Sequence, residues 1–378
     1  MTGARRVGTN TIFHAAIVPL DGPLYLEDHS KNNILDKTSR EGARPMDTVT
    51  LPKIFETLGA FRRTAALKTA IELDLFSAIG NGTATSAELA ERCLASERGI
   101  RKLCNYLVGL GFIKAIDEGY VLTPGAAAFL DRGSPTWLGA PASEAIAGTP
   151  LLAAFGALTE AVRKGSTALD GDGTLSPEHP IWVAFAQAMG VPAAVFARLL
   201  ADCLSENTEP PRKILDIAGG HGLYGIEFAA RDPHTEVFAV EWPQVLEVAR
   251  SNAEARGVSG RFHAISGDAL TVEFRGGYDL ALITNFLPDL RSTEGLLKRV
   301  HSALVDNGRV ALFEVMLNED RISPPAAVDL DLALLATTPS AETRTASELT
   351  AALRRAGFSR VEIRDIPPAP GRIAIAYM

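Results

Sequence analysis

The chain has 378 residues, of which 47% are hydrophobic and 22% charged, so it is long and apolar enough for two or three domains with a large core. Its formal net charge of −8 argues against nucleic acid as the main partner. The three cysteines are scattered, with no C-x-x-C pair, which makes a disulfide framework or a zinc site unexpected. No apolar run reaches membrane-spanning length and no signal-peptide pattern opens the chain, so we expect a cytoplasmic protein without a membrane segment.

Residues 1–45 mix Gly, Pro, Asn, Ser and charge without sustained periodicity, which predicts a disordered extension or a translation start at Met46. From Leu51 the pattern becomes helical. Apolar residues at helical spacing predict a packed helix that contains Ile54, Phe55, Leu58, Phe61, Ala65, Ala66 and Ala70. A second run over residues 66–79 predicts another helix, which ends at Gly80.

A winged-helix unit is predicted next, within a domain over residues 46–130. Thr85 and Glu88 read as a capping box, and Ser96 as the N-cap of a second helix. A hairpin over residues 112–123, turning at Asp117-Glu-Gly119, follows the two helices. Such a unit either binds DNA, here through Arg98, Arg101 and Lys102, or serves packing and dimerisation. The weak basic face favours the second alternative.

The next segment, residues 131–205, is predicted to consist of alanine-rich helices. Trp182, Phe185 and Met189 recur at helical spacing, which fits either a substrate pocket or plain core. Asp170 and Asp172 resemble the start of a calcium loop, but no later glutamate completes it, so no metal is expected.

From residue 206 to residue 378, strand and helix patterns alternate, which predicts a parallel sheet with helices on both faces. The predicted strands, in chain order, are 213–218, 236–241, 261–266, 278–284, 308–314, 361–366 and 372–377, with a helix over 347–356. The linker between the last two strands is too short for a helical crossover, so these two strands must be antiparallel.

The chain is organised around Lys213–Gly225, in which a short apolar strand runs into Gly219, Gly220, Gly222 and Gly225 and then into a helix. Taken alone, this turn also satisfies the dinucleotide fingerprint. The reversed final strand instead favours a nucleoside ligand without a pyrophosphate.

Acidic residues lie at or near the ends of three of the predicted strands, namely Asp216, Glu241 and Asp268. Glu241 is placed to accept hydrogen bonds from ribose hydroxyls, and Asp268 is placed near the adenine ring. Each carboxylate could equally be solvated or cap a helix.

The chain from Met46 onward resembles the class I S-adenosylmethionine-dependent O-methyltransferases that act on plant phenolics and bacterial polyketides. The motifs that carry the resemblance are Lys213–Gly225, Glu241-Trp-Pro, Gly267-Asp268, Asn285-Phe-Leu and Asn318-Glu-Asp-Arg-Ile-Ser-Pro-Pro. It implies a Rossmann-like sheet with an antiparallel C-terminal hairpin, preceded by a mainly α winged-helix dimerisation domain. It also implies a homodimer, in which the winged helix contributes to the partner's pocket, and a small-molecule acceptor.

The cofactor implied by the resemblance is S-adenosyl-L-methionine. The residues implied to bind it are Asp216, Gly219, Gly220, Gly222, Glu241, Gly267, Asp268 and Asn285. One glycine of the family motif is replaced here by Ala218.

The serious departure from the family follows the fourth predicted strand. The family places a histidine there as the general base, and this chain has Pro288. The family's supporting glutamate is kept as Glu314, whereas its second glutamate is replaced by Thr343. Asp289 and His179 are the candidate substitutes for the base. His221, in the glycine turn, is expected to face cofactor or solvent.

Three functions therefore remain open. The first, which we favour, is O-methylation of a small molecule in secondary metabolism without the usual histidine base. The second is a methyltransferase-fold enzyme that uses the sulfonium cofactor for decarboxylation, hydroxylation or cyclisation. The third is a ligand-sensing regulator whose winged helix binds DNA.

Overall fold

A seven-stranded sheet in the order β6-β5-β4-β7-β8-β10-β9 forms the C-terminal half of the protein. Its strands are β4 (Lys213–Ile217), β5 (Glu236–Glu241), β6 (Phe262–Ser266), β7 (Tyr278–Thr284), β8 (Leu304–Glu314), β9 (Arg360–Asp365) and β10 (Arg372–Tyr377). The strands from β6 to β8 pair in parallel, while β10 runs antiparallel to both β8 and β9. The predicted alternation and the reversed final strand are therefore confirmed.

The computed structural model describes residues 49–117, 119–175, 179–206, 208–286 and 290–378. The predictions for residues 1–45, for Glu118 in the hairpin turn and for Pro288 and Asp289 lie outside these residues. A compact unit runs from Pro52 to Met378. Strand bounds agree with the predictions to within one residue, except that β8 begins at Leu304 instead of Gly308.

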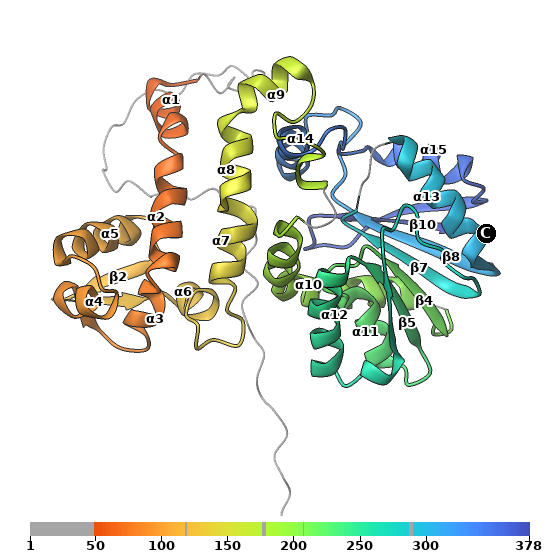
Figure 1. The fold of residues 1–378 in the computed structure, drawn as a ribbon, viewed down its shortest axis with the longest axis horizontal. Coiled ribbons are helices and arrows are strands. Elements are labelled where there is room, and N and C mark those ends of the chain that lie inside the picture. Colours follow the sequence, from red (N-terminus) through yellow and green to blue (C-terminus); the bar gives the residue numbers. More distant parts are fainter. Residues whose placement is uncertain (1–48, 118, 176–178, 207, 287–289) are drawn as a thin grey trace, which may run out of the picture. The chain divides into compact units, whose positions relative to one another are not determined.

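Helices cover both faces of the sheet (Figure 1). The helices of this half are α10 (Ile181–Ser205), α11 (Leu223–Arg231), α12 (Pro243–Ala255), η2 (Ser259–Arg261), α13 (Leu290–Ala303), α14 (Pro325–Thr337) and α15 (Ala346–Arg355). Alternate residues of β7 point to opposite faces: Leu280 and Leu282 pack with α10 and α11, whereas Ala281 and Ile283 pack with α13 and α15. The sheet is thus buried on both sides, as its apolar strands require.

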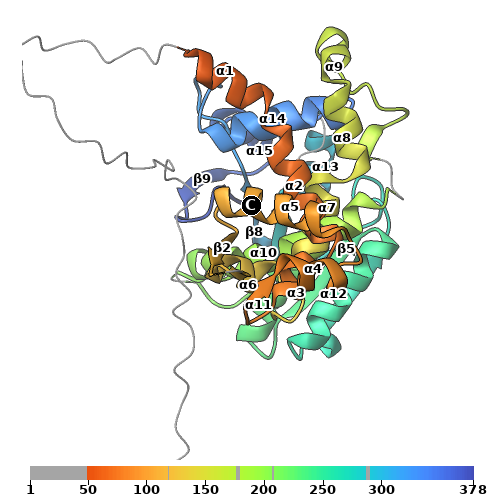
Figure 2. The same ribbon diagram turned by 90° about the vertical axis from the view of Figure 1, so that its left-hand side faces the viewer.

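The N-terminal half contains the predicted winged helix, in which α3, α4 and α5 lie beside a small sheet in the order β1-β3-β2 (Figure 2). Its elements are α1 (Leu51–Leu58), α2 (Phe61–Glu72), α3 (Leu75–Ile79), β1 (Ala84–Thr85), α4 (Ser86–Arg92), α5 (Glu97–Gly109), β2 (Ile113–Ile116) and β3 (Gly119–Leu122). The capping box of Thr85 and Glu88 and the Ser96 N-cap are both formed. The helices that follow are α6 (Pro124–Phe129), α7 (Gly139–Ala147), α8 (Thr149–Gly156), α9 (Leu158–Lys164) and η1 (Gly173–Leu175).

Two predictions for the first helices are wrong. The run over residues 66–79 is not one helix, because Asp74 adopts a left-handed conformation (φ 53°) that separates α2 from α3. The expected packed helix from Leu51 is also wrong, since α1 buries none of its residues in the described chain. Phe55 and Leu58 are 63% and 69% exposed.

The long helix α10 has the length and hydropathy of a membrane span, so the expectation that no apolar run is long enough is wrong on that criterion. No other single helix among the described residues meets it; a bent pair, Gly139–Gly156 with Leu158–Lys164, meets it only if the two are counted as one span. In this fold the apolar residues of α10 form core instead, because Ala197, Leu200 and Leu204 are buried against the sheet. Apolar core helices of this length satisfy the same test.

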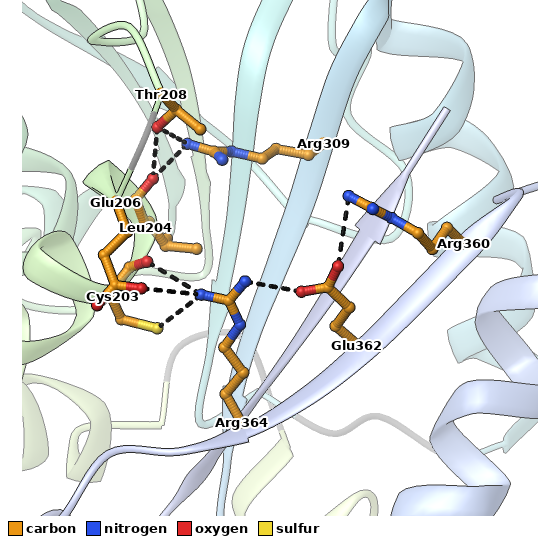
Figure 3. Close-up of polar contacts among 8 residues, drawn as sticks. All are labelled: Cys203, Leu204, Glu206, Thr208, Arg309, Arg360, Glu362 and Arg364. Atoms are coloured by element: carbon orange, nitrogen blue, oxygen red, sulfur yellow. Dashed lines mark hydrogen bonds and ion pairs between the residues drawn. The ribbon is translucent and has the colours of Figure 1, made fainter.

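The C-terminal end of α10 is held to the sheet by arginines (Figure 3). Arg309 on β8 donates to the Leu204 carbonyl at 2.6 Å and to Thr208 Oγ1 at 3.2 Å. Arg364 on β9 donates to the Cys203 carbonyl at 3.4 Å and pairs with Glu362 at 2.7 Å. Positive side chains thereby satisfy carbonyls that have no partner within the helix.

Candidate active site

Polar side chains collect at the carboxyl-terminal edge of the sheet. Glu241 and Glu314 end β5 and β8, and Asp216 lies one residue before the end of β4. The chain runs from β4 outward to β5 and β6, then returns to add β7 on the other side of β4. Ligands of open α/β sheets bind at this kind of topological switch point, beyond the carboxyl ends of the strands.

The glycine turn after β4 has a left-handed backbone at three residues. Ala218, Gly220 and Gly222 have φ values of 50°, 55° and 68°. A Cβ on Gly222 would lie 3.0 Å from the Cβ of Ala249, so glycine is needed there for space as well as for conformation. Ala218, which replaces a glycine of the family motif, adopts a conformation that strains an L-residue.

Asp216 is fully buried beneath this turn, at 0% exposure. Its Oδ2 accepts a hydrogen bond from the backbone N–H of Gly225 at 3.3 Å, and its Oδ1 has no hydrogen-bond partner among the described residues. Burial, with a smaller contribution from the nearby Glu241, raises the pKa of Asp216 to about 7, against the lowering effect of the Gly225 N–H. Asp216 therefore holds a proton far more readily than an ordinary aspartate does.

Glu241 connects the end of β5 to the glycine turn. Its Oε2 accepts from Gly220 N at 3.0 Å, and its Oε1 from Trp242 N at 2.8 Å. Burial raises the pKa of Glu241, while these two N–H donors lower it. A carboxylate has about four acceptor positions, so two backbone bonds leave room for two hydroxyl donors.

Gly267 and Asp268 follow β6. Gly267 has a φ of 151° and donates its N–H to the Glu241 carbonyl at 3.1 Å, which places this loop beside β5. Asp268 Oδ1 accepts from Leu270 N at 2.8 Å. Asp268 Oδ1 therefore caps its own loop, and a place for Asp268 beside the adenine ring stays a prediction.

The segment after β7 is hydrogen-bonded to the end of β8, which brings Asn285 and Glu314 together at the carboxyl-terminal edge of the sheet. Asn285 has a φ of 51° and donates its N–H to the Phe313 carbonyl at 2.9 Å. Glu314, 2% exposed, accepts from Phe286 N at 3.0 Å. Burial raises the pKa of Glu314 to about 8, with the Phe286 N–H and the buried Arg344 acting in the opposite direction.

Tyr224 is a site residue that the sequence analysis missed. It is buried on the first turn of α11, and its pKa is raised by burial, by Asp216 and by Glu314, with a hydrogen bond to Asn285 acting the other way. Its ring lies 5.8 Å from the ring of Phe313. The available signal was an aromatic residue inside the glycine turn, at Gly222-Leu-Tyr-Gly225.

The two histidines singled out from the sequence have structural partners. His179 Nδ1 accepts from Ile181 N at 3.3 Å at the start of α10, and its role as a base stays a prediction. His221 is 7% exposed, not solvent-facing, and its Nδ1 accepts from Leu223 N at 3.2 Å. Burial lowers the pKa of His221 to about 4. Asp289, the other candidate base, lies outside the described residues.

Helix α10 approaches the glycine turn, since a Cβ on Gly220 would lie 3.9 Å from the Cβ of Ala186. Trp182 and Phe185 pack edge to face on this helix, with ring centroids 6.2 Å apart. A separate hollow of about 390 Å³ is formed by α14, the end of α9 at Gly165 and the loop over 338–342. Its lining includes none of the residues of the glycine turn.

The residues present fit S-adenosylmethionine. The buried Oδ1 of Asp216 lacks a donor within the part of the chain that the structure describes, and the ligand carries an ammonium group that can supply one. Glycines at 219, 220 and 222 keep Cβ atoms away from the turn, and Glu241 retains acceptor capacity for a ribose. No group of three possible metal ligands is found in the part of the chain that the structure describes.

Comparison with known proteins identifies the family. Residues 185–359 match the O-methyltransferase domain, and residues 55–132 match the O-methyltransferase dimerisation domain. A crystal structure from Nostoc punctiforme, assigned to the O-methyltransferases, is 43% identical, covers 88% of this chain and 100% of that chain, and has a TM-score of 0.82. The protein therefore belongs to the S-adenosylmethionine-dependent O-methyltransferases.

Two further relatives are enzymes of bacterial origin. The 3-hydroxy-5-methyl-1-naphthoate 3-O-methyltransferase of Streptomyces sahachiroi is 28% identical over 82% of this chain and 91% of its own length. The structure of PigF with SAH, a Serratia methyltransferase, is 26% identical, covers 87% of this chain and 100% of that chain, and has a TM-score of 0.79. S-adenosyl-L-methionine is accordingly the cofactor of this enzyme, and the cofactor predicted from the sequence is confirmed.

Proposed function

We propose that the enzyme methylates a phenolic hydroxyl of a small aromatic product of secondary metabolism, in the cytoplasm, with Glu314 as the general base. The naphthoate named for the Streptomyces relative supports an aromatic acceptor. S-adenosylmethionine supplies an electrophilic methyl group. The chain must then bind the acceptor, exclude water and take up the phenolic proton.

The proposal depends on the placement of Glu314. The family histidine is absent at Pro288, and Glu314 is fixed by a 3.0 Å hydrogen bond to Phe286 N, two residues before that position. Only one of its oxygens is used by this bond. The raised pKa, about 8, brings this carboxylate closer to a phenol, whose pKa is about 10. A base matched in this way contributes roughly two to four decades in rate.

The test is methyl transfer to 3-hydroxy-5-methyl-1-naphthoate, measured as methylated product and as S-adenosylhomocysteine in the same reaction. Equal amounts of the two support methylation. A changed naphthoate that carries no new methyl group, formed without S-adenosylhomocysteine, would instead favour the non-methylating alternative. Glu314→Gln is expected to lower kcat by about 10²- to 10⁴-fold with unchanged cofactor affinity. Wild-type rates in Glu314→Gln would show that another residue is the base. His179→Gln is the matched second variant, because His179 is another candidate base.

We also propose that the enzyme acts as a homodimer. The dimerisation domain and the exposed apolar face of α1, which carries Ile54, Phe55 and Leu58, support this assembly. Apolar residues at helical spacing that stay in contact with water are typical of an interface with another chain. The winged helix would then serve association instead of DNA binding.

A further inference from the structure

Tyr224 lies between the glycine turn and the end of β8. It is buried on the first turn of α11, and the next residue, Gly225, donates its N–H to Asp216 Oδ2 at 3.3 Å. On its other side the Tyr224 ring packs against Phe313, with 5.8 Å between the ring centroids. Phe313 directly precedes Glu314 on β8. One buried side chain thus joins the glycine turn to the strand end that carries the proposed base.

The hydroxyl of Tyr224 reaches a third element, the segment after β7. It is hydrogen-bonded to the side chain of Asn285. The backbone N–H of Asn285 in turn donates to the Phe313 carbonyl at 2.9 Å. Tyr224 therefore contacts both partners of this backbone hydrogen bond: its ring packs against Phe313, and its hydroxyl binds Asn285.

The backbone that Tyr224 supports is strained and controls the orientation of Glu314. Asn285 has a φ of 51°, a left-handed conformation that persists only where the surroundings fix it. Its side chain is exposed, so packing contributes little to fixing it. The next residue, Phe286, donates its N–H to Glu314 at 3.0 Å. The position of the Glu314 carboxylate therefore depends on the Asn285–Phe286 turn.

Tyr224 is not itself a base. Burial and the carboxyl groups of Asp216 and Glu314 raise the pKa of Tyr224 above that of an ordinary tyrosine. A neutral phenol of this kind keeps its own proton and cannot take up the proton of the acceptor. The role of the hydroxyl therefore lies in the contact that it makes with Asn285.

We propose that Tyr224 is a positioning residue for methyl transfer, which holds the Asn285–Phe286 turn so that the Glu314 carboxylate faces the acceptor hydroxyl. This inference rests on the proposed role of Glu314 as the general base. A base that is displaced by 1 Å can lose about 10²-fold in rate, because the reacting atoms no longer meet in the productive geometry. The loss falls on kcat, since Glu314 is not needed to bind the cofactor.

The first test is Tyr224→Phe, which keeps the buried ring and removes only the hydroxyl. With 3-hydroxy-5-methyl-1-naphthoate as acceptor, we expect kcat to fall by about 3- to 10-fold, the effect of one neutral hydrogen bond. The KM for the acceptor and the Kd for S-adenosylhomocysteine should stay within about twofold of wild type. An unchanged kcat, or an unchanged kcat with weaker binding of S-adenosylhomocysteine, would overturn the proposal.

The matched control is Tyr278→Phe. Tyr278 is buried to the same extent, 2% exposed, but it lies at the start of β7, the opposite end of that strand from Asn285. Its kcat should equal that of wild type. Equal losses of kcat in the two variants would show that any buried tyrosine hydroxyl has this effect, and would overturn the assignment to Tyr224.

A double variant tests whether the effect passes through Glu314. In the Glu314→Gln background, Tyr224→Phe should cause no further loss of kcat, because the base that it positions is already absent. The same fold loss in both backgrounds would contradict the proposal. Wild-type rates in Glu314→Gln alone would instead contradict the proposed function, in which Glu314 is the base.

Amide hydrogen exchange tests the positioning without turnover. In Tyr224→Phe, a peptide that contains Asn285 and Phe286 is expected to exchange about 3- to 10-fold faster than in wild type, whereas Tyr278→Phe should leave it unchanged. Thermal unfolding of both variants shows whether the change is local. Unchanged exchange in this peptide would overturn the proposal even if kcat falls. Faster exchange together with wild-type rates in Glu314→Gln would contradict the role of the base and not the hold of Tyr224 on the turn.

Discussion

The carboxylate of Glu241 accepts a hydrogen bond from the backbone N–H of Gly220, with 3.0 Å between Oε2 and the nitrogen. The two residues are 21 positions apart, and this bond joins the end of β5 to the glycine turn after β4. Glu241 therefore has two uses. It fixes the turn that must cradle the cofactor, and it retains the acceptor capacity that a ribose requires.

Replacing Glu241 by alanine is expected to lower the affinity for S-adenosylmethionine by about 10- to 100-fold. Hydrogen bonds to a charged group contribute about 1.5–3 kcal/mol, and the loosened turn adds to the loss. Calorimetric titration measures the change. Glu247→Ala is the matched control, because Glu247 is exposed on α12 and pairs only with nearby Arg250 among the described interactions. An affinity within twofold of wild type would refute the ribose role of Glu241.

The rate of methyl transfer is expected to rise with pH. A general base must be ionised, and burial raises the pKa of Glu314 to about 8. Below this value the ionised fraction grows about tenfold per pH unit, so kcat at saturating substrates should climb from pH 6 and level off above pH 8. In Glu314→Gln the residual rate should lose this dependence. A wild-type profile that is flat from pH 6 to pH 9 would contradict the assignment.

Replacing Ala218 by glycine is expected to stabilise the protein by up to about 1 kcal/mol. Its φ of 50° is left-handed, a conformation that costs an L-residue about 1–2 kcal/mol and that glycine adopts without this cost. Part of the gain is lost because glycine gives up more chain entropy on folding than alanine does. Urea unfolding measures the difference. Ala229→Gly on α11 is the matched control and should destabilise by about 1 kcal/mol. Equal losses in both variants would mean that Ala218 is not strained.

Sequence patterns predicted the sheet well because strands and glycine turns are local signals. Apolar runs located β4, β5 and β7 within one residue, and glycines flank β4 and β7. The break at Asp74 was hidden, since Leu67, Ile71, Leu75 and Ile79 continue the helical spacing straight across it. An aspartate tolerates the left-handed conformation, but nothing in the residues beside it requires a break.

The site was predicted less completely than the fold. Residue types placed Asp216 and Glu241 at strand ends and the family resemblance added Glu314, but the partners of these groups depend on distant backbone atoms such as Gly220 N and Phe286 N. Tyr224 escaped notice because an aromatic residue in a helix is usually core. Periodicity likewise shows that one face of α1 is apolar, without showing what covers it.

Replacing Arg309 by alanine is expected to destabilise the protein by about 2 kcal/mol. Its half-buried guanidinium donates to the Leu204 carbonyl and to Thr208, so its loss removes a charged donor that joins β8 to the end of α10 and leaves Thr208 Oγ1 as the donor to that carbonyl. Arg360→Ala is the control: the Arg360 side chain is 62% exposed, so its change should cost less than about 1 kcal/mol. Urea unfolding compares the two. A smaller loss of unfolding free energy in Arg309→Ala than in Arg360→Ala would show that Arg309 does not anchor α10 to the sheet.

Replacing Phe55 by glutamate on α1 is expected to convert the proposed dimer into a monomer. Phe55 is 63% exposed in the single chain, so the charge costs nothing there, whereas burial in an apolar interface would leave a carboxylate unpaired. Light scattering on a sizing column measures the molar mass, for which one chain is 40.2 kDa. Glu56→Gln, on the same helix, is the control and should stay dimeric. If wild type and both variants all elute with the mass of one chain, the enzyme acts alone and the apolar face of α1 has another occupant.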